Sequence, residues 1–274
     1  MAYSGKVTVG GTPDVHELED LIITKVAVGS MNNNAYVLRC RDTDEQLLID
    51  AAAEPATLLE VVGADGLRSV VTTHRHGDHW QALSAVVAAT GARTFAGRYD
   101  AEGIPVLTDV PVEDGDTLTV GRVTLTARRI VGHTPGSIVL TYDDPHGHPH
   151  TFTGDCLFPG GVGNSHGDPA AFASLLQDVT TKLFDVLPDE TWVYPGHGDD
   201  TTLGAERPHL AEWRERGWRP SRSDAPAADE EGHGLDHTTT PLTPCVSEVQ
   251  SSAVHSAAAP DPGPDDRHPA RDRA

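Results

Sequence analysis

The segment 74–79 holds four potential metal ligands within six residues, in the run Thr73-His74-Arg75-His76-Gly77-Asp78-His79-Trp80. His74, His76 and Asp78 are spaced at i, i+2 and i+4. In an extended chain, side chains two residues apart point the same way, so this spacing predicts that the three converge on one point. On a helix the same spacing would scatter them. Because imidazole and carboxylate groups bind zinc, iron and similar ions, the segment predicts a metal site.

The elements that must position this segment are apolar on both sides. Ser69–Thr73 is a β-branched run typical of a strand, and Gln81–Ala89 is mainly apolar at helical spacing. Two buried elements would hold the intervening loop rigid, as a metal site requires. The second histidine-rich run, His146-Gly147-His148-Pro149-His150, lies among aspartate, glycine and proline without an apolar flank. We interpret it as a solvated hairpin tip.

Three further motifs each place one histidine or aspartate beside glycine at the end of a strand-like run. They are Val131-Gly132-His133-Thr134-Pro135-Gly136-Ser137, Thr153-Gly154-Asp155-Cys156 and Tyr194-Pro195-Gly196-His197-Gly198. In this order, after His-x-His-x-Asp-His, the set resembles the metallo-β-lactamase-fold hydrolase superfamily. The closest resemblance is to its glyoxalase II-like (hydroxyacylglutathione hydrolase-like) branch, over roughly residues 20–205.

This resemblance implies a centre with two metal ions. It assigns the first ion to His74, His76 and His133. It assigns the second ion to Asp78, His79 and His197, and Asp155 to both ions. Asp50, at the end of the strand-like run Gln46–Asp50, matches the early aspartate of the family, which orients ligands from outside; a strand-end or helix-cap aspartate is the alternative. Two zinc ions are expected, with iron or manganese as alternatives.

Such a centre needs no serine or cysteine nucleophile. Two divalent ions about 3.5–4 Å apart share a hydroxide, lower the pKa of bound water to about 7 and stabilise the oxyanion formed at a carbonyl. Asp78 would orient the bridging hydroxide, and the two oxygens of Asp155 suit it to bridge two cations. We interpret Cys156 as a small buried residue, since it lies between a strand end and Leu157-Phe158.

The favoured reaction is hydrolysis of a thioester of a low-molecular-weight thiol. In the glyoxalase II-like branch, a lysine and a tyrosine after the Gly-Asp motif bind glutathione. Asn164 stands where that lysine would be, His166 stands near the tyrosine, and no basic helical domain follows Trp218. Glutathione therefore lacks its expected partners, and the thiol stays open. Trp80, Asn164 and His166 are the candidate substrate-pocket residues.

Other functions remain as alternatives. The first is a persulfide dioxygenase that uses one iron ion, bound by His74, His133 and Asp155. A lactonase or another ester or amide hydrolase is the second. A non-catalytic metal-binding protein is the third, and it is disfavoured because all seven ligand positions are filled.

Composition favours a cytoplasmic enzyme that acts on small molecules. With 20 Lys and Arg against 41 Asp and Glu, the net charge of -21 repels phosphate backbones and argues against nucleic acid as a partner. The three cysteines, Cys40, Cys156 and Cys245, are widely spaced and suggest no disulfide framework. Met1–Asp20 does not have the pattern of a signal peptide, and no stretch approaches the roughly 18 apolar residues of a membrane span. Oligomeric state is left open.

Strand and helix patterns alternate along the first part of the chain. We therefore expect an α/β fold, and the resemblance implies a four-layer αββα sandwich of two mixed sheets. The predicted hydrolase domain spans residues 1–220. Residues 221–274 contain no Phe, Trp or Tyr and many Pro, Ala and Asp, so we expect a disordered acidic tail.

Overall fold

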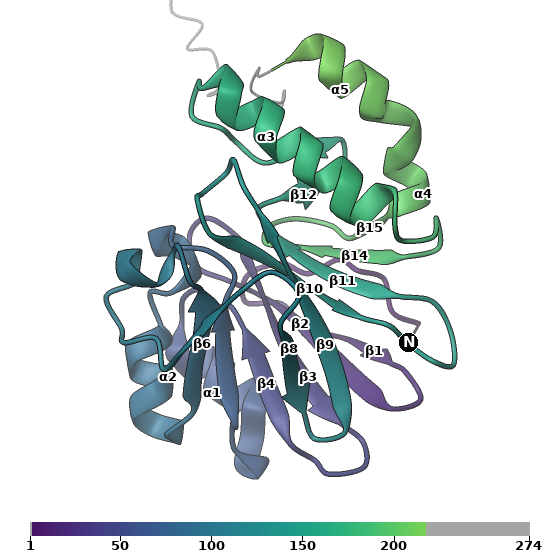
Figure 1. Ribbon diagram of the computed structural model, residues 1–274. Coiled ribbons are helices and arrows are strands. Elements are labelled where there is room, and N and C mark those ends of the chain that lie inside the picture. The colour runs from purple at the N-terminus through teal and green to yellow at the C-terminus, as the bar shows by residue number, and fades with distance from the viewer. Residues whose placement is uncertain (1, 218–274) are drawn as a thin grey trace, which may run out of the picture. The chain divides into compact units, whose positions relative to one another are not determined.

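Apolar side chains on both faces of the strands explain why this chain folds into layers. In β3 (Asn33–Cys40), Tyr36 and Leu38 lie in one core cluster and Val37 in another. Successive side chains of a strand point to opposite faces, so such a strand must be covered on both sides. The computed structural model, which describes residues 2–217, has two stacked sheets with helices on both outer faces (Figure 1).

The first sheet has seven strands in chain order. They are β1 (Asp14–Glu17), β2 (Leu21–Val28), β3, β4 (Gln46–Ile49), β5 (Ser69–Thr72), β6 (Arg93–Gly97) and β7 (Val110–Val112). The pairs from β1 to β4 are antiparallel and those from β4 to β7 are parallel. Parallel pairs need crossover connections, and the helices α1 (Pro55–Val62) and α2 (Leu83–Thr90) lie in two of them.

The second sheet has six strands in the order β15-β14-β11-β10-β9-β8. They are β8 (Thr117–Val120), β9 (Val123–Ile130), β10 (Ser137–Tyr142), β11 (His150–Gly154), β14 (Trp192–Pro195) and β15 (Thr201–Thr202). Only β11 and β14 pair in parallel, across the helix α3 (Pro169–Val179). The short strands β12 (Leu157–Phe158) and β13 (Gly161–Val162) form a separate hairpin, and α4 (Leu203–Glu206) and α5 (Leu210–Arg216) complete the outer layer.

Three apolar clusters join the four layers. Both sheets contribute to the central cluster, for example Leu38 of β3 and Leu140 of β10. A second cluster lies beneath α1 and α2 and includes Leu58 and Val86. The third lies beneath α3 to α5 and includes Leu176 and Trp213. Full burial of such side chains stabilises the fold by about 1.5–3 kcal/mol each, so the layers are held mainly by apolar burial.

The predicted fold class is confirmed. Helix α3 begins at Pro169, where two backbone N–H groups donate to the Asp168 side chain, and it ends in a π-helical turn over Thr180–Phe184. The interpretation of the second histidine run as a solvated tip is wrong for His150, which is 1% exposed because β11 begins there. The predicted tail, 221–274, and the last three residues of the predicted domain lie outside the described residues. Among those described, no helix is long and apolar enough to cross a membrane.

Candidate metal centre

The seven side chains singled out from the sequence follow four strand ends at one end of the sandwich. His74 and the run behind it follow β5, and His133 follows β9. Asp155 follows β11, and His197 follows β14. Within the second sheet β9, β11 and β14 run in the same direction, so their carboxyl ends meet at one edge.

One group of ligand atoms comes from His74, His76 and His133. The Nε2 atom of His133 lies 2.9 Å from Nδ1 of His76 and 3.2 Å from Nε2 of His74. Two nitrogens bound to one tetrahedral zinc ion, each at about 2.0–2.1 Å, lie about 3.3 Å apart. The nitrogens are therefore spaced as ligands of a single ion would be.

A second group comes from Asp78, His79 and His197. Oδ2 of Asp78 lies 3.4 Å from Nε2 of His79 and 3.3 Å from Nε2 of His197. Asp155 lies between the groups: its Oδ1 is 3.3 Å from Nε2 of His79, and its Oδ2 is 3.6 Å from Nε2 of His133. One carboxylate thus faces ligand atoms of both groups.

The expectation that His74, His76 and Asp78 converge on one point is wrong for Asp78. The extended backbone continues only to His76, and Gly77–His79 form one 3₁₀ turn. This turn places the ligand atoms of Asp78 and His79 together with that of His197. The i, i+2 argument holds only while the chain stays extended, and a single turn divides the run between two groups.

Each histidine of the second group, and His133 of the first, has its outer ring nitrogen beside an acceptor. Nδ1 of His79 lies 2.8 Å from Oδ2 of Asp50, and Nδ1 of His133 lies 2.8 Å from the carbonyl oxygen of Asn164. Nδ1 of His197 lies 3.1 Å from the carbonyl oxygen of Met31. An acceptor at Nδ1 holds the proton there and leaves Nε2 as the ligand atom.

Asp50 connects His79 of the second group to Thr73, the residue that follows β5 and precedes His74 of the first group. It accepts hydrogen bonds from the backbone N–H and the hydroxyl of Thr73, at 2.7 Å and 2.8 Å, besides facing His79. Its backbone is left-handed, with φ of 58°. A non-glycine residue rarely adopts this conformation, and surrounding contacts must hold it there.

Two contacts of this centre went unrecognised in the sequence. Asn33 donates from Nδ2 to Oδ2 of Asp78 at 2.8 Å. Asp100 is 0% exposed and accepts from the backbone N–H of Arg75 and from the hydroxyl of Thr134, so it links the two loops of the first group. No local sequence pattern connects Asn33 with Asp78, and nothing in the sequence around Asp100 marks that residue.

Two glycines permit the close packing around Asp155. A Cβ atom on Gly196 would overlap the Asp155 carboxylate and lie 2.8 Å from the His79 ring. A Cβ atom on Gly163 would overlap the carbonyl oxygen of Asp155. Glycine is therefore required at both positions by the approach of the backbone to the centre.

The two groups differ in their charge without metal. Burial lowers the pKa of all three histidines in the first group, that of His133 to about 4. Burial also acts on His79 and His197, but nearby carboxylates outweigh it: Asp155 and Asp50 hold the pKa of His79 well above its usual value, and hydrogen bonds to Asp155 and Asp78 raise the pKa of His197 to about 9. At neutral pH the first group is ready to bind a cation, whereas the second must lose protons to do so.

The donor set fits a divalent metal. Nε2 of His79 and Oδ1 of Asp155 are buried and have no hydrogen-bond partner. A buried polar group without a partner destabilises the folded state by about 1–3 kcal/mol, and by more when it is charged. A bound metal ion would supply the missing partner for both atoms. Neutral imidazoles with carboxylates are the ligands that zinc and iron prefer.

The remaining predicted residues lie around the centre in different ways. The Trp80 indole donates to the carbonyl oxygen of Arg75 at 2.9 Å and packs against the cluster beneath α1 and α2. His166 is exposed, has a left-handed backbone with φ of 53°, and lies with its ring centroid 5.3 Å from that of His76. The Asn164 side chain accepts from the backbone N–H of His166 at 2.7 Å. Cys156 is fully buried, and burial strongly raises the pKa of its thiol, as expected for a packing residue.

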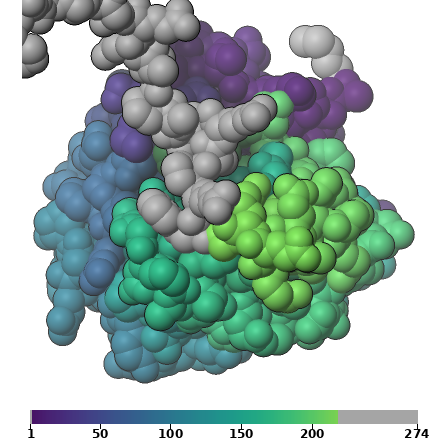
Figure 2. Space-filling model, turned by 90° about the horizontal axis from the view of Figure 1, so that it is seen from above, coloured from purple at the N-terminus to yellow at the C-terminus, as the bar shows by residue number. Residues whose placement is uncertain are grey.

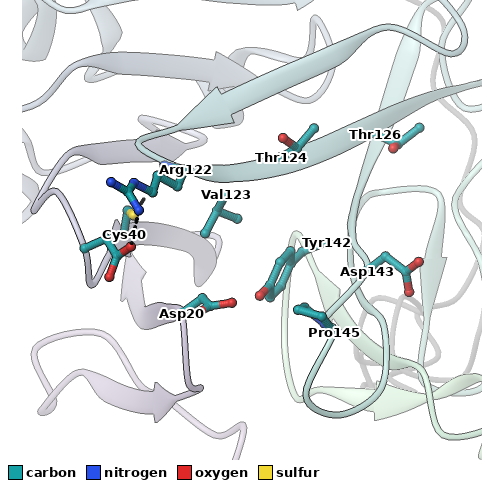
Figure 3. Close-up of a pocket in the computed structure, with 10 residues that line it drawn as sticks. Asp20, Cys40, Arg122, Val123, Thr124, Thr126, Tyr142, Asp143 and Pro145 are labelled. Atoms are coloured by element: carbon teal, nitrogen blue, oxygen red, sulfur yellow. Dashed lines mark hydrogen bonds and ion pairs between the residues drawn. The ribbon is translucent and has the colours of Figure 1, made fainter.

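A cavity of about 480 Å³ lies away from this centre, at the other end of β3 (Figure 3). Its wall includes Cys40, Arg122, Thr124 and Tyr142. Arg122 pairs with Asp42 at 3.2 Å. None of the described groups of metal-ligating side chains lies in this cavity.

Comparison with known proteins identifies a family and several relatives. The sequence model of the metallo-beta-lactamase superfamily matches residues 28–197. A hydroxyacylglutathione hydrolase from Polaromonas sp. is 35% identical over 182 residues, 65% of this chain and 66% of that protein. The human mitochondrial persulfide dioxygenase ETHE1 is 31% identical over 166 residues, 59% of this chain and 62% of that protein.

A solved structure gives the same result for the fold. The crystal structure of ETHE1 from Myxococcus xanthus has a TM-score of 0.60 and 28% identity, and the match covers 69% of this chain and 82% of that one. The chain spans slightly less than two thirds of the length of the two sequence relatives, 66% and 62%. The range that the family model matches, 28–197, contains all seven side chains of the centre.

Proposed function

Because this chain belongs to the metallo-beta-lactamase superfamily, we propose that it is a metal-dependent hydrolase that cleaves a thioester of a low-molecular-weight thiol at a centre of two divalent ions. His74, His76 and His133 would hold one ion, and Asp78, His79 and His197 the other. Asp155 would bridge them. Zinc is the expected metal, and iron or manganese is the alternative.

The observation that carries this proposal is the position of Asp155 between two complete groups. Its two carboxylate oxygens lie 3.3 Å and 3.6 Å from ligand nitrogens of His79 and His133. A second contact joins its Oδ2 to Nε2 of His197 at 3.6 Å. A site for one ion needs only one group, so a carboxylate that contacts histidines of both groups favours two ions.

Bound divalent ions supply a water of lowered pKa and polarise the carbonyl of the substrate. The protein residues determine how such a water is oriented. Asp78, already fixed by Asn33 at 2.8 Å, would accept its hydrogen bond and direct the attacking oxygen. A thiolate leaves with a conjugate-acid pKa near 8.5, about seven units below that of water, so no strong general acid is needed.

We expect the segment after β13 to line the substrate side of the centre. His166 stands beside the first group and is exposed, so its ring would contact the substrate. Phe158 of β12 has its ring centroid 6.4 Å from that of His197 and would contribute apolar surface on the other side. This combination favours a substrate with both a polar and an apolar part. The resemblance to a hydroxyacylglutathione hydrolase supports a thioester, while Asn164 in place of the expected lysine argues against glutathione as the thiol.

A persulfide dioxygenase is the second candidate. The three side chains that would hold a single iron ion also lie together: Nε2 of His133 is 3.2 Å from Nε2 of His74 and 3.6 Å from Oδ2 of Asp155. The human relative is named persulfide dioxygenase ETHE1, and the Myxococcus structure is named ETHE1. A reaction at one iron ion would not need the second group, which is complete in this chain, and this favours the hydrolase.

Metal content and substrate turnover together test the proposal. The full chain is purified without chelator, its metals are counted by mass spectrometry, and acyl thioesters of glutathione, coenzyme A and N-acetylcysteamine are assayed by thiol release. Two zinc ions per chain with thiol release, lost after chelation and restored by zinc, are expected. One iron ion with oxygen uptake on a persulfide would replace the proposal with the second candidate. Full metal loading without turnover of thioester, lactone or persulfide would leave a metal-binding protein without hydrolase activity.

A further inference from the structure

Lys25 is a lysine without any contact with solvent. It lies in β2, is 0% exposed, and is among the largest fully buried side chains of the described residues. Its Nζ atom donates to the carbonyl oxygens of Gly5 and Gly198, both at 2.8 Å, and to Oδ1 of Asp200 at 2.6 Å. All three protons of the ammonium group are therefore used within the protein.

Asp200 completes this buried pair. Its side chain is 1% exposed, and its Oδ2 accepts from the Tyr3 hydroxyl at 2.5 Å and from Nε1 of Trp192 at 2.9 Å. The backbone N–H of Asp200 donates to the carbonyl oxygen of Gly5 at 3.2 Å. In Figure 2 the purple N-terminal residues lie along one side of the molecule, against green residues of the last third of the described chain. The N-terminal segment is thus part of the setting of the pair.

The pair lies directly behind His197. Gly198, the next residue, offers its carbonyl oxygen to Lys25 and also to Nδ2 of Asn34 at 2.9 Å. On the other side, the carbonyl oxygen of Pro195 accepts from Nδ2 of Asn34 and from the Tyr36 hydroxyl. The His197 side chain is 24% exposed, whereas that of His79, the other histidine of the second group, is 0% exposed. Buried polar groups therefore hold the backbone of His197 on both sides.

Stability alone does not account for such a pair. Removing two charges from water is costly, and a buried ion pair replaced by apolar residues of similar volume is often as stable or more stable. Its directional hydrogen bonds, in contrast, define one position for the groups that they join. We propose that Lys25 and Asp200, completed by Tyr3 and Gly5 of the N-terminal segment, are positioning residues that set the place of His197 and so the affinity of the second metal group.

An exposed lysine–aspartate pair that includes Asp199, the neighbour of Asp200 in sequence, provides a matched control. Lys6 binds Asp199 at 2.8 Å, but the side chains are 70% and 51% exposed. An exposed ion pair contributes little to stability or geometry. Lys6→Met therefore removes a lysine–aspartate contact next to Asp200 without touching the buried pair.

The test measures the two metal affinities separately in the full chain. Metal-free protein is titrated with Co²⁺, and the visible absorption bands report stepwise binding. In Lys25→Met/Asp200→Leu, which replaces the buried ion pair with apolar side chains, we expect the second ion to bind about 10–100-fold more weakly, as for other partners outside the ligand set. The first ion should bind as in the wild type, and Lys6→Met should change neither affinity.

A milder variant keeps the test valid if the double variant does not fold. Tyr3→Phe preserves the ring that stacks on His16 and removes only one donor to Asp200. We expect a smaller loss of second-ion affinity, with the melting temperature of the metal-free protein unchanged. Unchanged affinity of both ions in the double variant would refute the inference, as would an equal loss at both ions, which would indicate a general structural role.

This inference rests on the two-metal centre proposed above, and the two fail differently. If the wild type binds only one Co²⁺ ion, the two-metal centre is refuted and the inference with it. If the wild type binds two ions and the double variant binds both as tightly, only the positioning role is refuted.

Discussion

Two clusters of histidines occur in this molecule, and they differ in what surrounds the rings. In the candidate metal centre, five histidines and two aspartates direct ligand atoms at common points. In the second cluster, His16 and His150 lie beside Tyr194, and the His148 ring lies beside that of His150. Nδ1 of His16 and Nδ1 of His150 are 2.8 Å and 3.0 Å from the Tyr194 hydroxyl.

The difference lies in the carboxylates. The centre has Asp155 between its groups and Asp50 behind His79 at 2.8 Å. In the second cluster burial, together with the charges of His148 and His16, lowers the pKa of His150 to about 3, so its ring is neutral and packs like an aromatic side chain. No group of metal ligands is found there among the described residues. Density of histidines therefore does not make a metal site; convergence of lone pairs together with negative charge does.

The largest effect should come from removing the shared carboxylate. Asp155→Ala deletes a ligand from both groups, so we expect loss of metal and a fall in activity of more than about 100-fold, beyond the range for partners outside the ligand set. Metal content by mass spectrometry and steady-state kinetics measure both. His150→Gln in the other cluster is the matched control and should retain full metal content. Equal metal content in both variants would break the comparison.

An intermediate effect is expected at Asp50. Asp50→Asn replaces one acceptor oxygen with a donor facing Thr73 or His79, so the outer nitrogen of His79 is no longer fixed. We expect metal affinity or activity to fall about 10–100-fold while the fold is kept. Competition with a chelator measures the affinity, and circular dichroism checks the fold. An unchanged affinity would show that the carboxylate behind His79 is dispensable.

The smallest effect concerns the acid stability of the second cluster. The pKa of His150 is about 3 in the folded chain, below the ordinary value of 6.5, so between these values the unfolded state binds a proton that the folded state does not. Its contribution to stability is complete above pH 6.5 and is lost as the pH falls below it, by about 1.4 kcal/mol at pH 5.5.

Urea unfolding at pH 7.5 and pH 5.5 tests this directly. The wild type should lose about 1.4 kcal/mol more than His150→Gln between the two pH values, because the variant cannot titrate at this position. Parallel pH dependences would mean that burial does not lower the pKa of His150 in the folded protein.

The layered fold could be predicted well because its causes are local. Strand ends carry the motifs, and the nearly continuous apolar run Ala35–Cys40 requires cover on both faces. The helix at Pro169 was predictable from Asp168 and the proline that follows it. His150 was misjudged because its neighbours in sequence are turn residues, while its neighbours in space, such as Tyr194, lie 44 positions away.

For the centre, the sequence by itself determined which residues carry chemistry, since imidazoles and carboxylates at strand ends are recognisable from type and order alone. Only the tertiary structure decided how they are divided, because one 3₁₀ turn at Gly77–His79 sends Asp78 toward His197. It also decided which residues hold them: Asp50 reaches His79 across 29 positions, and Lys25 reaches Asp200 across 175. Such contacts join strands that only folding brings together, and no local pattern encodes them.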